Sequence, residues 1–416
     1  MRFSKNNLTM EFIDSISQVS ADEWQLLTRS SSPFLQHDFF NTLETSSCAH
    51  RSQGWQPNHL LISTSNSLQK NHVEIEAKPS SKLASKLSPA LTPELTDLPD
   101  IIEAIMPMYL KSHSWGEYVF DWAWADAYKH HGVDYYPKLV ATIPFTPISS
   151  SKLITNTLSY SQVFDFMIDY CQQQSIGSWH VLYCPQLPLT DSKEEYSDDI
   201  YQRNTVQFHW FNRDFQTFEQ FLQTFTSRKR KNTKKERLTI AQQGIEIRTV
   251  LGADITEQEL DFFYLTYQLT YVRRGHSPHL SHDFFKQILL TMADNIVLII
   301  ASHQQKDIAC AWFFFDDEQL YGRYWGCTEY FNNLHFELCY YQGIEFCIKN
   351  NLQSFNPGTQ GEHKIQRGFE PVLTYSYHWI NHPAFKPAIK EFCQQEQVQM
   401  QQYLLQCRQA LPFKVN

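Results

Sequence analysis

Short apolar runs, typical of strands, alternate with helix-spaced apolar residues along the first half of the chain. Phe120, Trp124 and Tyr128 recur every fourth residue, which predicts an amphipathic helix over 116–132 that ends at a glycine. The other patterns in this half predict strands at 10–16, 59–65, 101–114, 136–147 and 178–185, and helices at 31–46 and 160–174.

The second half repeats this style. Its patterns predict strands at 205–212, 296–302, 307–315, 319–327, 354–358 and 372–380, and helices near 217–226, 227–237, 256–273, 282–293, 335–351 and the Gln-rich C-terminus. Each half places several strands before a helix and returns with a further strand. The stretches 109–118 and 320–330 are loosely alike, so the order of elements predicts two similar α/β lobes.

Two stretches without a core-forming pattern interrupt this order. Residues 66–100 are rich in Ser, Lys and Pro, which predicts a loop insertion in the first lobe. The acidic stretch 190–199 marks the expected boundary, so we predict lobes over 1–195 and 200–416.

Composition indicates a soluble globular protein, with 42% hydrophobic and 19% charged residues. The net charge of −9 argues against a general nucleic-acid coat protein. No apolar signal region opens the chain, and the longest apolar run is too short to span a bilayer, so we expect a cytoplasmic protein with reduced thiols. The sequence has no P-loop, GxGxxG, HExxH, GxSxG or metal-ligand spacing, and we expect no metal.

Four groups of polar residues are candidates for chemistry. The first lies at 111–128, where Lys111, His113, Asp121 and Trp124 combine charge with aromatic rings. Substrate binding is one interpretation, and a helix capped by polar residues and packed through its tryptophans is the other.

The second group is the basic run 227–237, which has seven Lys or Arg residues and one Glu. Its charges are spread around the predicted helix. A solvated helix explains them, and so does capture of phosphates on a coenzyme, a nucleotide-linked sugar or a tRNA backbone.

The third group joins a strand to the start of the helix predicted at 335–351. Arg323 and Trp325 lie in the strand, and His335, Glu337 and Tyr341 follow near the helix N-terminus, which favours anions. Substrate binding, with Glu337 as a candidate catalytic acid or base, is weighed against a simple charge preference at a helix end.

The fourth group is "GTQGEHKIQRGF", residues 358–369, which holds three of only 13 glycines. Glycine lets the backbone turn sharply and approach a ligand. Around the glycines stand a candidate base, a candidate oxyanion stabiliser and further polar groups: Gln360, Glu362, His363, Lys364 and Arg367. The alternative is a polar surface turn.

These blocks, together with "PFLQHDFFNTLE", "YYPKLVATIPFTP", "QFHWFN" and "LHFELCYYQGIEFCI", resemble the FemAB-like family of predicted N-acyltransferases across roughly 30–380. That family is related to the GNAT superfamily and to the ligases that extend peptidoglycan cross-bridges with aminoacyl-tRNA. The resemblance implies two tandem GNAT-like lobes of mixed sheet flanked by helices, and transfer of an acyl group to an amine. It also implies that Lys364 stabilises the tetrahedral intermediate.

Two classes of function follow. The first is an acyl- or aminoacyltransferase that uses acyl-CoA or aminoacyl-tRNA as donor, with Lys364, Glu362, His363 and Glu337 as candidate catalytic residues. The second is a non-catalytic GNAT-like protein that binds a cell-wall precursor or a partner, which the lack of a recognisable coenzyme-A pyrophosphate loop favours. tRNA binding through 227–237 is a further possibility.

Overall fold

The computed structural model describes residues 2–5, 7–28, 30–64, 101–189, 196, 198–359 and 361–414. The predicted insertion at 66–100 and most of the acidic stretch at 190–199 lie outside the described residues.

The described strands form two sheets. The smaller has the order β1 (Arg2–Lys5), β2 (Leu8–Ile13), β4 (His59–Thr64), β5 (Ile101–Met106), β8 (Ile154–Thr155). The larger has the order β11 (Ile245–Leu251), β12 (Ile296–His303), β13 (Lys306–Phe315), β14 (Gln319–Cys327), β15 (Ser354–Asn356), β10 (Ile200–Phe211), β16 (Glu370–Ile380), β9 (Ser178–Cys184), β7 (Lys138–Ala141), β6 (Met108–Lys111), β3 (Trp55–Pro57).

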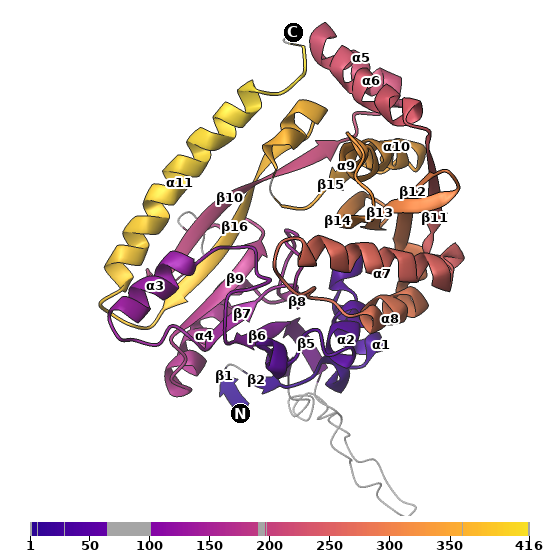
Figure 1. The fold of residues 1–416 in the computed structure, drawn as a ribbon. Helices are drawn as coiled ribbons and strands as arrows, with labels where there is room; N and C mark the ends of the chain where they lie inside the picture. Colours follow the sequence, from indigo (N-terminus) through magenta and orange to yellow (C-terminus); the bar gives the residue numbers. More distant parts are fainter. Residues whose placement is uncertain are drawn as a thin grey trace, which may run out of the picture.

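Helices flank both sheets (Figure 1). In chain order they are α1 (Ala21–Leu27), α2 (His37–Thr45), α3 (Trp122–His130), α4 (Tyr160–Gln173), α5 (Phe218–Gln223), α6 (Ser227–Gln242), α7 (Glu257–Val272), α8 (His282–Met292), α9 (Leu334–Phe336), α10 (Gln342–Lys349) and α11 (Lys386–Gln409). Among the described helices none combines the length and the apolar character needed to span a bilayer.

The two halves share one order of elements. In the first half the order is β2, α1, α2, β4, β5 with β6, β7, α4 and β9. The corresponding order in the second half is β11, α7, α8, β12, β13, β14, α10 and β15. The strands pair antiparallel until the last pair of each half, where a helix crosses over and β7–β9 and β14–β15 are parallel. This repetition confirms the predicted α/β class with two lobes of mixed sheet flanked by helices.

Strands from the two halves join in the larger sheet. β16 pairs antiparallel with β10 on one side and with β9 on the other. The long helix α11 runs along β10 and β16 (Figure 1). The boundary near 195–200 stays a prediction, because the sheet continues through both sets of strands.

Aromatic rings fill the contact between the halves. The ring of Phe34, in the turn before α2, lies 5.1 Å from the rings of both Phe314 and Tyr321 in the second half. Edge-to-face pairs of this kind add to the free energy of burying the rings. The abundance of Phe, Tyr and Trp is thereby explained in part.

Three predicted elements differ from the observed ones. The strand expected at 101–114 divides at Pro107 into β5 and β6, which belong to different sheets; proline has no N–H to donate to a ladder. The helix expected at 116–132 begins only at Trp122, and Phe120 precedes it with 54% of its surface exposed. The helix expected at 335–351 contains a π-helical turn, Glu337–Tyr341.

Candidate active site

A cleft of about 720 Å³ opens where the two halves meet. Its walls come from the loop 114–122 of the first half, the C-terminal end of α7, the strand β14, the helical region 335–340 and the loop 357–364. Five of the predicted site residues lie in its lining, and all come from the second half: Arg323, Trp325, His335, His363 and Lys364. Three separate sequence blocks therefore meet in one cavity.

The glycine-rich stretch forms a short 3₁₀ helix, Glu362–Arg367, between two glycines. Gly361 and Gly368 have φ angles of 101° and 85°, in the left-handed region that side chains disfavour. The two turns place Lys364 at the floor of the cleft, where only 2% of its surface is exposed.

Lys364 is held by backbone alone. Its Nζ donates hydrogen bonds to the carbonyl oxygens of Gly358 at 2.7 Å and Thr359 at 3.1 Å. Burial, reinforced by the charge of Arg323, lowers the pKa of Lys364 to about 7. Near neutral pH the amine therefore exchanges readily between its charged and neutral forms.

His363 has a defined hydrogen-bond partner in the helical region 335–340. The Tyr340 hydroxyl lies 2.8 Å from His363 Nε2. Within the described part of the chain no hydrogen bond engages Nδ1 of the same ring. Burial and the charges of Arg367 and Lys364 lower the pKa of His363, so its imidazole is neutral at pH 7 and can accept a proton.

The π-helical turn explains why Tyr340 reaches this position. An extra residue in a helical turn rotates the side chains that follow it, and such turns are frequent at functional sites. Cys339 and Tyr340 face the cleft, whereas Glu337 and Tyr341 face α6. His335, one turn earlier, also lines the cleft, and burial lowers its pKa to about 4.

The cleft is cationic. Arg274, Arg323 and Lys364 line it, and no ion pair engages these three among the described residues. The described lining also contains no aspartate or glutamate. Arg323 Nη2 donates to the carbonyl of Phe145 at 2.5 Å, while its buried Nε has no partner. The surroundings therefore favour an anionic ligand.

Three predicted site residues lie behind the cleft and attach α6 to the second lobe. Arg237 of α6 forms hydrogen bonds with Glu337, the closest at 2.8 Å. Tyr341 donates to Glu236, and Arg367 pairs with the same carboxylate at 2.9 Å. The structure therefore gives Glu337, Tyr341 and Arg367 structural partners and does not bring them to the cavity.

Glu362 and Gln360 are also not placed in the cavity. Glu362 is exposed and accepts a hydrogen bond of 2.8 Å from Tyr403 of α11. Gln360 lies outside the described residues.

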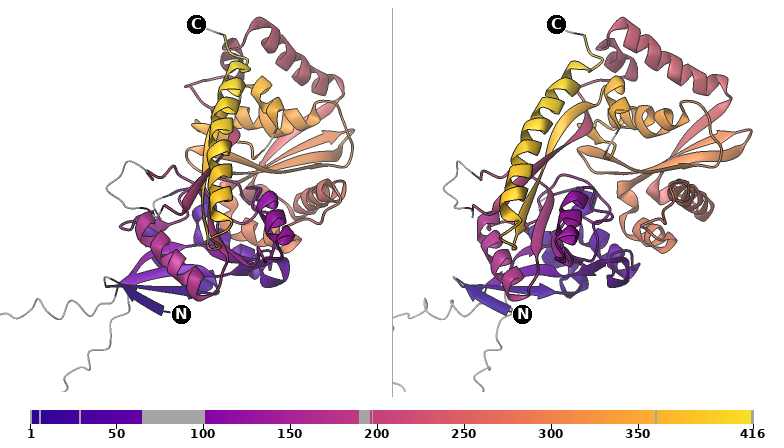
Figure 2. Two further views of the ribbon diagram at one scale, coloured as in Figure 1. Left: turned by 90° about the vertical axis from the view of Figure 1, so that its left-hand side faces the viewer. Right: turned by 60° about the vertical axis from the view of Figure 1, so that its left-hand side comes forward.

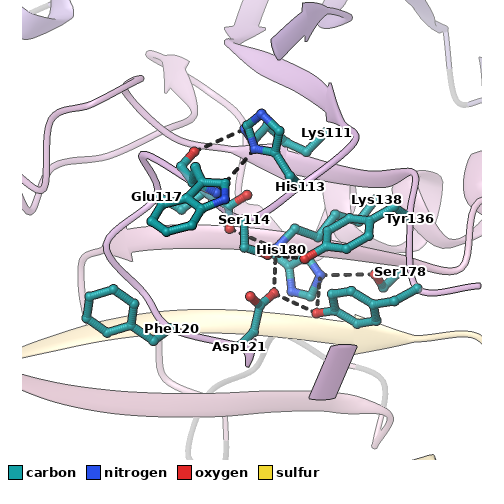
Figure 3. Close-up of polar contacts among 12 residues, drawn as sticks. Lys111, His113, Ser114, Glu117, Phe120, Asp121, Tyr136, Lys138, Ser178 and His180 are labelled. Atoms are coloured by element: carbon teal, nitrogen blue, oxygen red, sulfur yellow. Dashed lines mark hydrogen bonds and ion pairs between the residues drawn. The ribbon is translucent and has the colours of Figure 1, made fainter. Parts of the chain in front are cut away.

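The first-half candidates surround a buried lysine that the sequence reasoning missed. Lys138 Nζ donates to Ser114 Oγ at 2.8 Å and Glu117 Oε2 at 2.7 Å, and also to Asp121 (Figure 3). Asp121 is thus an ion-pair partner and not a group in the cleft. A lone lysine within an otherwise apolar strand carries no signal of this role.

The other candidates of this group also serve the framework. Lys111 Nζ lies 3.5 Å above the Trp55 ring and donates to the carbonyl of Trp115 at 3.2 Å. His113 Nε2 lies 3.0 Å from the carbonyl of Gln53. Trp124 is buried against the guanidinium of Arg203, 4.9 Å from the ring centre.

A family model for peptidoglycan biosynthesis/recognition proteins matches residues 15–415. The chain belongs to the FemAB-like family. The resemblance inferred from the sequence is confirmed by this match. No curated protein matches the chain. Among the described residues, no group of three or more His, Cys, Asp or Glu side chains is placed to hold a metal ion.

Several solved structures are similar to this FemAB-like chain. FemX is 9% identical, with a TM-score of 0.45, and the match covers 89% of this chain and 98% of that one. A tandem GNAT protein from the clavulanic acid biosynthesis pathway is 8% identical, with a TM-score of 0.39 and coverages of 90% and 99%. The C-terminal domain of a putative lysylphosphatidylglycerol synthetase from Agrobacterium fabrum is 7% identical, with a TM-score of 0.45 and coverages of 70% and 85%.

Proposed function

We propose that this FemAB-like protein transfers an acyl or aminoacyl group from a thioester or ester donor to an amine in the cleft between its lobes. The observation that carries the proposal is the position of Lys364. Its amine is buried at the floor of a cationic cleft, is bound only by carbonyl oxygens, and adjoins a histidine that is neutral at pH 7.

The chemistry follows from these two groups. The amine nitrogen attacks the donor carbonyl carbon, a C–N bond forms, and negative charge develops on the carbonyl oxygen. Lys364 in its ammonium form stabilises that oxyanion, and His363 Nδ1 accepts the proton that leaves the amine. The C–S or C–O bond then breaks, the carbonyl reforms, and His363 returns the proton to the departing sulfur or oxygen, so that the donor leaves as a thiol or an alcohol.

Tyr340 and Arg323 support this chemistry. Through its hydroxyl, Tyr340 fixes the orientation of the His363 ring and engages Nε2, so Nδ1 is the nitrogen left to accept a proton. Arg323 and Arg274 supply positive charge for a phosphate-bearing substrate. Acyl-CoA and aminoacyl-tRNA both carry such phosphates, so the positive charge of the cleft suits either donor.

One surface favours the tRNA donor. Arg228, Lys231 and Lys235 of α6 follow a helical spacing of three and four residues, and all three are exposed. The helix lies at the end of the molecule opposite the smaller sheet (Figures 1 and 2). Charge reversal of these three residues should weaken binding of a tRNA donor and leave binding of acyl-CoA unchanged.

The test combines binding with turnover. The chain is screened by thermal shift against acetyl-CoA, longer acyl-CoAs and charged tRNA, and any donor that raises the melting temperature is then incubated with amines and followed by mass spectrometry. Acyl transfer that is lost in Lys364→Met supports the proposal. Binding of a precursor with no transfer from any donor would instead favour the non-catalytic binding protein.

A further inference from the structure

The loop 114–122 separates its side chains into two sets. Trp115, Tyr118, Phe120 and Trp122 line the cleft. The polar residues Ser114, Glu117 and Asp121 all bind Lys138 of β7, and of these three only Ser114 also lines the cleft. Figure 3 shows the three polar side chains gathered at the lysine, with the Phe120 ring turned away from them.

Two facing lysines hold this loop. Lys138 and Lys111 are direct register partners on β7 and β6 and are fully buried. Lys138 binds the three side chains, and Lys111 binds the backbone carbonyl of Trp115. The nearby tyrosines complete the contacts, because Tyr135 donates to Asp121 at 2.6 Å and Tyr136 lies 2.8 Å from Ser114 Oγ.

The rings on the other side remain open. Trp115 is 50% exposed, Phe120 54% and Trp122 36%, although each is a large apolar residue. The Trp115 ring lies 5.1 Å from that of Trp122 and 5.3 Å from that of His276, which comes from the second half. Exposed rings at the wall of a cationic cleft suit a ligand that has both a flat ring face and an anionic group.

Buried ion pairs contribute little net stability compared with apolar side chains of the same volume. Here the second carboxylate oxygens of Glu117 and Asp121 are buried without a hydrogen-bond partner, so the cluster is not optimised for stability. Its evident effect is geometric, since one ammonium binds three side chains of the segment 114–121, which contains no regular secondary structure.

We propose that Lys138 is a positioning residue: by binding Ser114, Glu117 and Asp121 together, it presents the aromatic rings of the loop 114–122 as the wall that binds the ring of an anionic ligand. The inference rests on the proposed function in one respect, that the substrate enters this cleft. The ring is a sugar or a nucleobase, because both offer a flat face to an aromatic side chain.

The test removes the ionic group as a whole. The variant Glu117→Gln/Asp121→Asn/Lys138→Met removes both carboxylates and the ammonium together, so none of the three is left as an unpaired charge, and we expect a melting temperature close to that of the unaltered protein. Hydrogen exchange of peptides that cover 114–122 should be at least tenfold faster in the variant, with exchange in α4 unchanged. Unchanged exchange in the loop would overturn the inference.

Binding separates positioning from folding. Inorganic phosphate, uridine monophosphate and N-acetylglucosamine 1-phosphate are compared by calorimetry. We expect the unaltered protein to bind one of the ring-bearing phosphates at least tenfold more tightly than phosphate, and the variant to lose this ratio while it retains phosphate affinity. Equal affinity for all three in the unaltered protein would overturn the role of the rings.

The outcomes are distinguishable from failure of the proposed function. If no phosphate compound binds, the substrate does not enter through this cleft and the proposed function falls, while the exchange measurement still decides whether Lys138 positions the loop. If the triple variant does not fold, Glu117→Gln alone keeps the Lys138–Asp121 pair and is measured in the same way, with a smaller but local increase in exchange expected.

Discussion

Replacement of Lys364 by methionine should abolish acyl transfer and yet make the protein more stable at neutral pH. Burial lowers the pKa of this amine from 10.5 to about 7. A drop of that size corresponds to about 5 kcal/mol of unfavourable free energy when the charged lysine enters the fold. Methionine has a similar length and no charge, but it leaves the carbonyls of Gly358 and Thr359 without their donor, which costs about 2 kcal/mol.

The sign of the effect depends on pH. The unfolded lysine keeps its proton up to about pH 10.5, whereas the folded lysine loses it above about pH 7, so the unfolded state binds more protons between these values. The stability of the unaltered protein therefore rises relative to the variant across this window. We expect Lys364→Met to be more stable by about 2–3 kcal/mol at pH 7 and less stable by about 1 kcal/mol at pH 10.

Urea unfolding at pH 7, 8.5 and 10 measures the difference in the free energy of unfolding between the two proteins. The other titrating groups are common to both, so their contributions to this difference cancel. Lys152→Met is the matched control. Burial also lowers the pKa of Lys152 to about 7, but its Nζ binds the carbonyls of Ile148 and Tyr183 in the first lobe, and none of these three residues lines the cleft. It should show the same pH trend and retain transfer activity. A difference between Lys364→Met and the unaltered protein that does not change with pH would refute the reasoning.

Three further variants test the site and the fold. Tyr340→Phe removes the hydroxyl that binds His363, so kcat should fall roughly fivefold with KM unchanged in steady-state kinetics; an unchanged kcat would contradict the role of this hydrogen bond. Arg323→Gln should weaken phosphate binding by about tenfold in calorimetry and reduce its salt dependence; undiminished affinity would place the anion elsewhere. Gly326→Ala would put a methyl group 2.1 Å from a carbonyl oxygen of α7, so urea unfolding should show a loss of about 3 kcal/mol, whereas Gly177→Ala, which meets nothing within 4 Å, should be neutral.

The strongest periodic signals in the sequence predicted their elements well. The helix expected at 256–273 is α7, Glu257–Val272, and the three successive strands that follow α8 agree within a residue or two with β12, β13 and β14. Apolar periodicity over a long stretch is a local property of the sequence, so it predicts a helix or strand without knowledge of the tertiary structure.

Side-chain direction could not be predicted in the same way. Glu337 and His335 are two residues apart on a helix, so their side chains face opposite sides. Glu337 contacts α6 and His335 lines the cleft, but the sequence does not tell which side of the helix meets the cleft. The loop before α3 failed as a helix because its polar residues bind Lys138, a contact between segments far apart in the chain. The glycine-rich stretch was informative because left-handed backbone angles are specific to glycine.

The position of β16 has a consequence for synthesis of the chain. β16 lies between β10 and β9, so the edge of β9 that will meet it is open while the second lobe is still being made. An unpaired strand edge is a template for wrong pairing with other chains. The first lobe is therefore translated early, but its strand β9 gains its second neighbour only after β16 has been translated. A nascent chain of this protein is most exposed to aggregation between these two points.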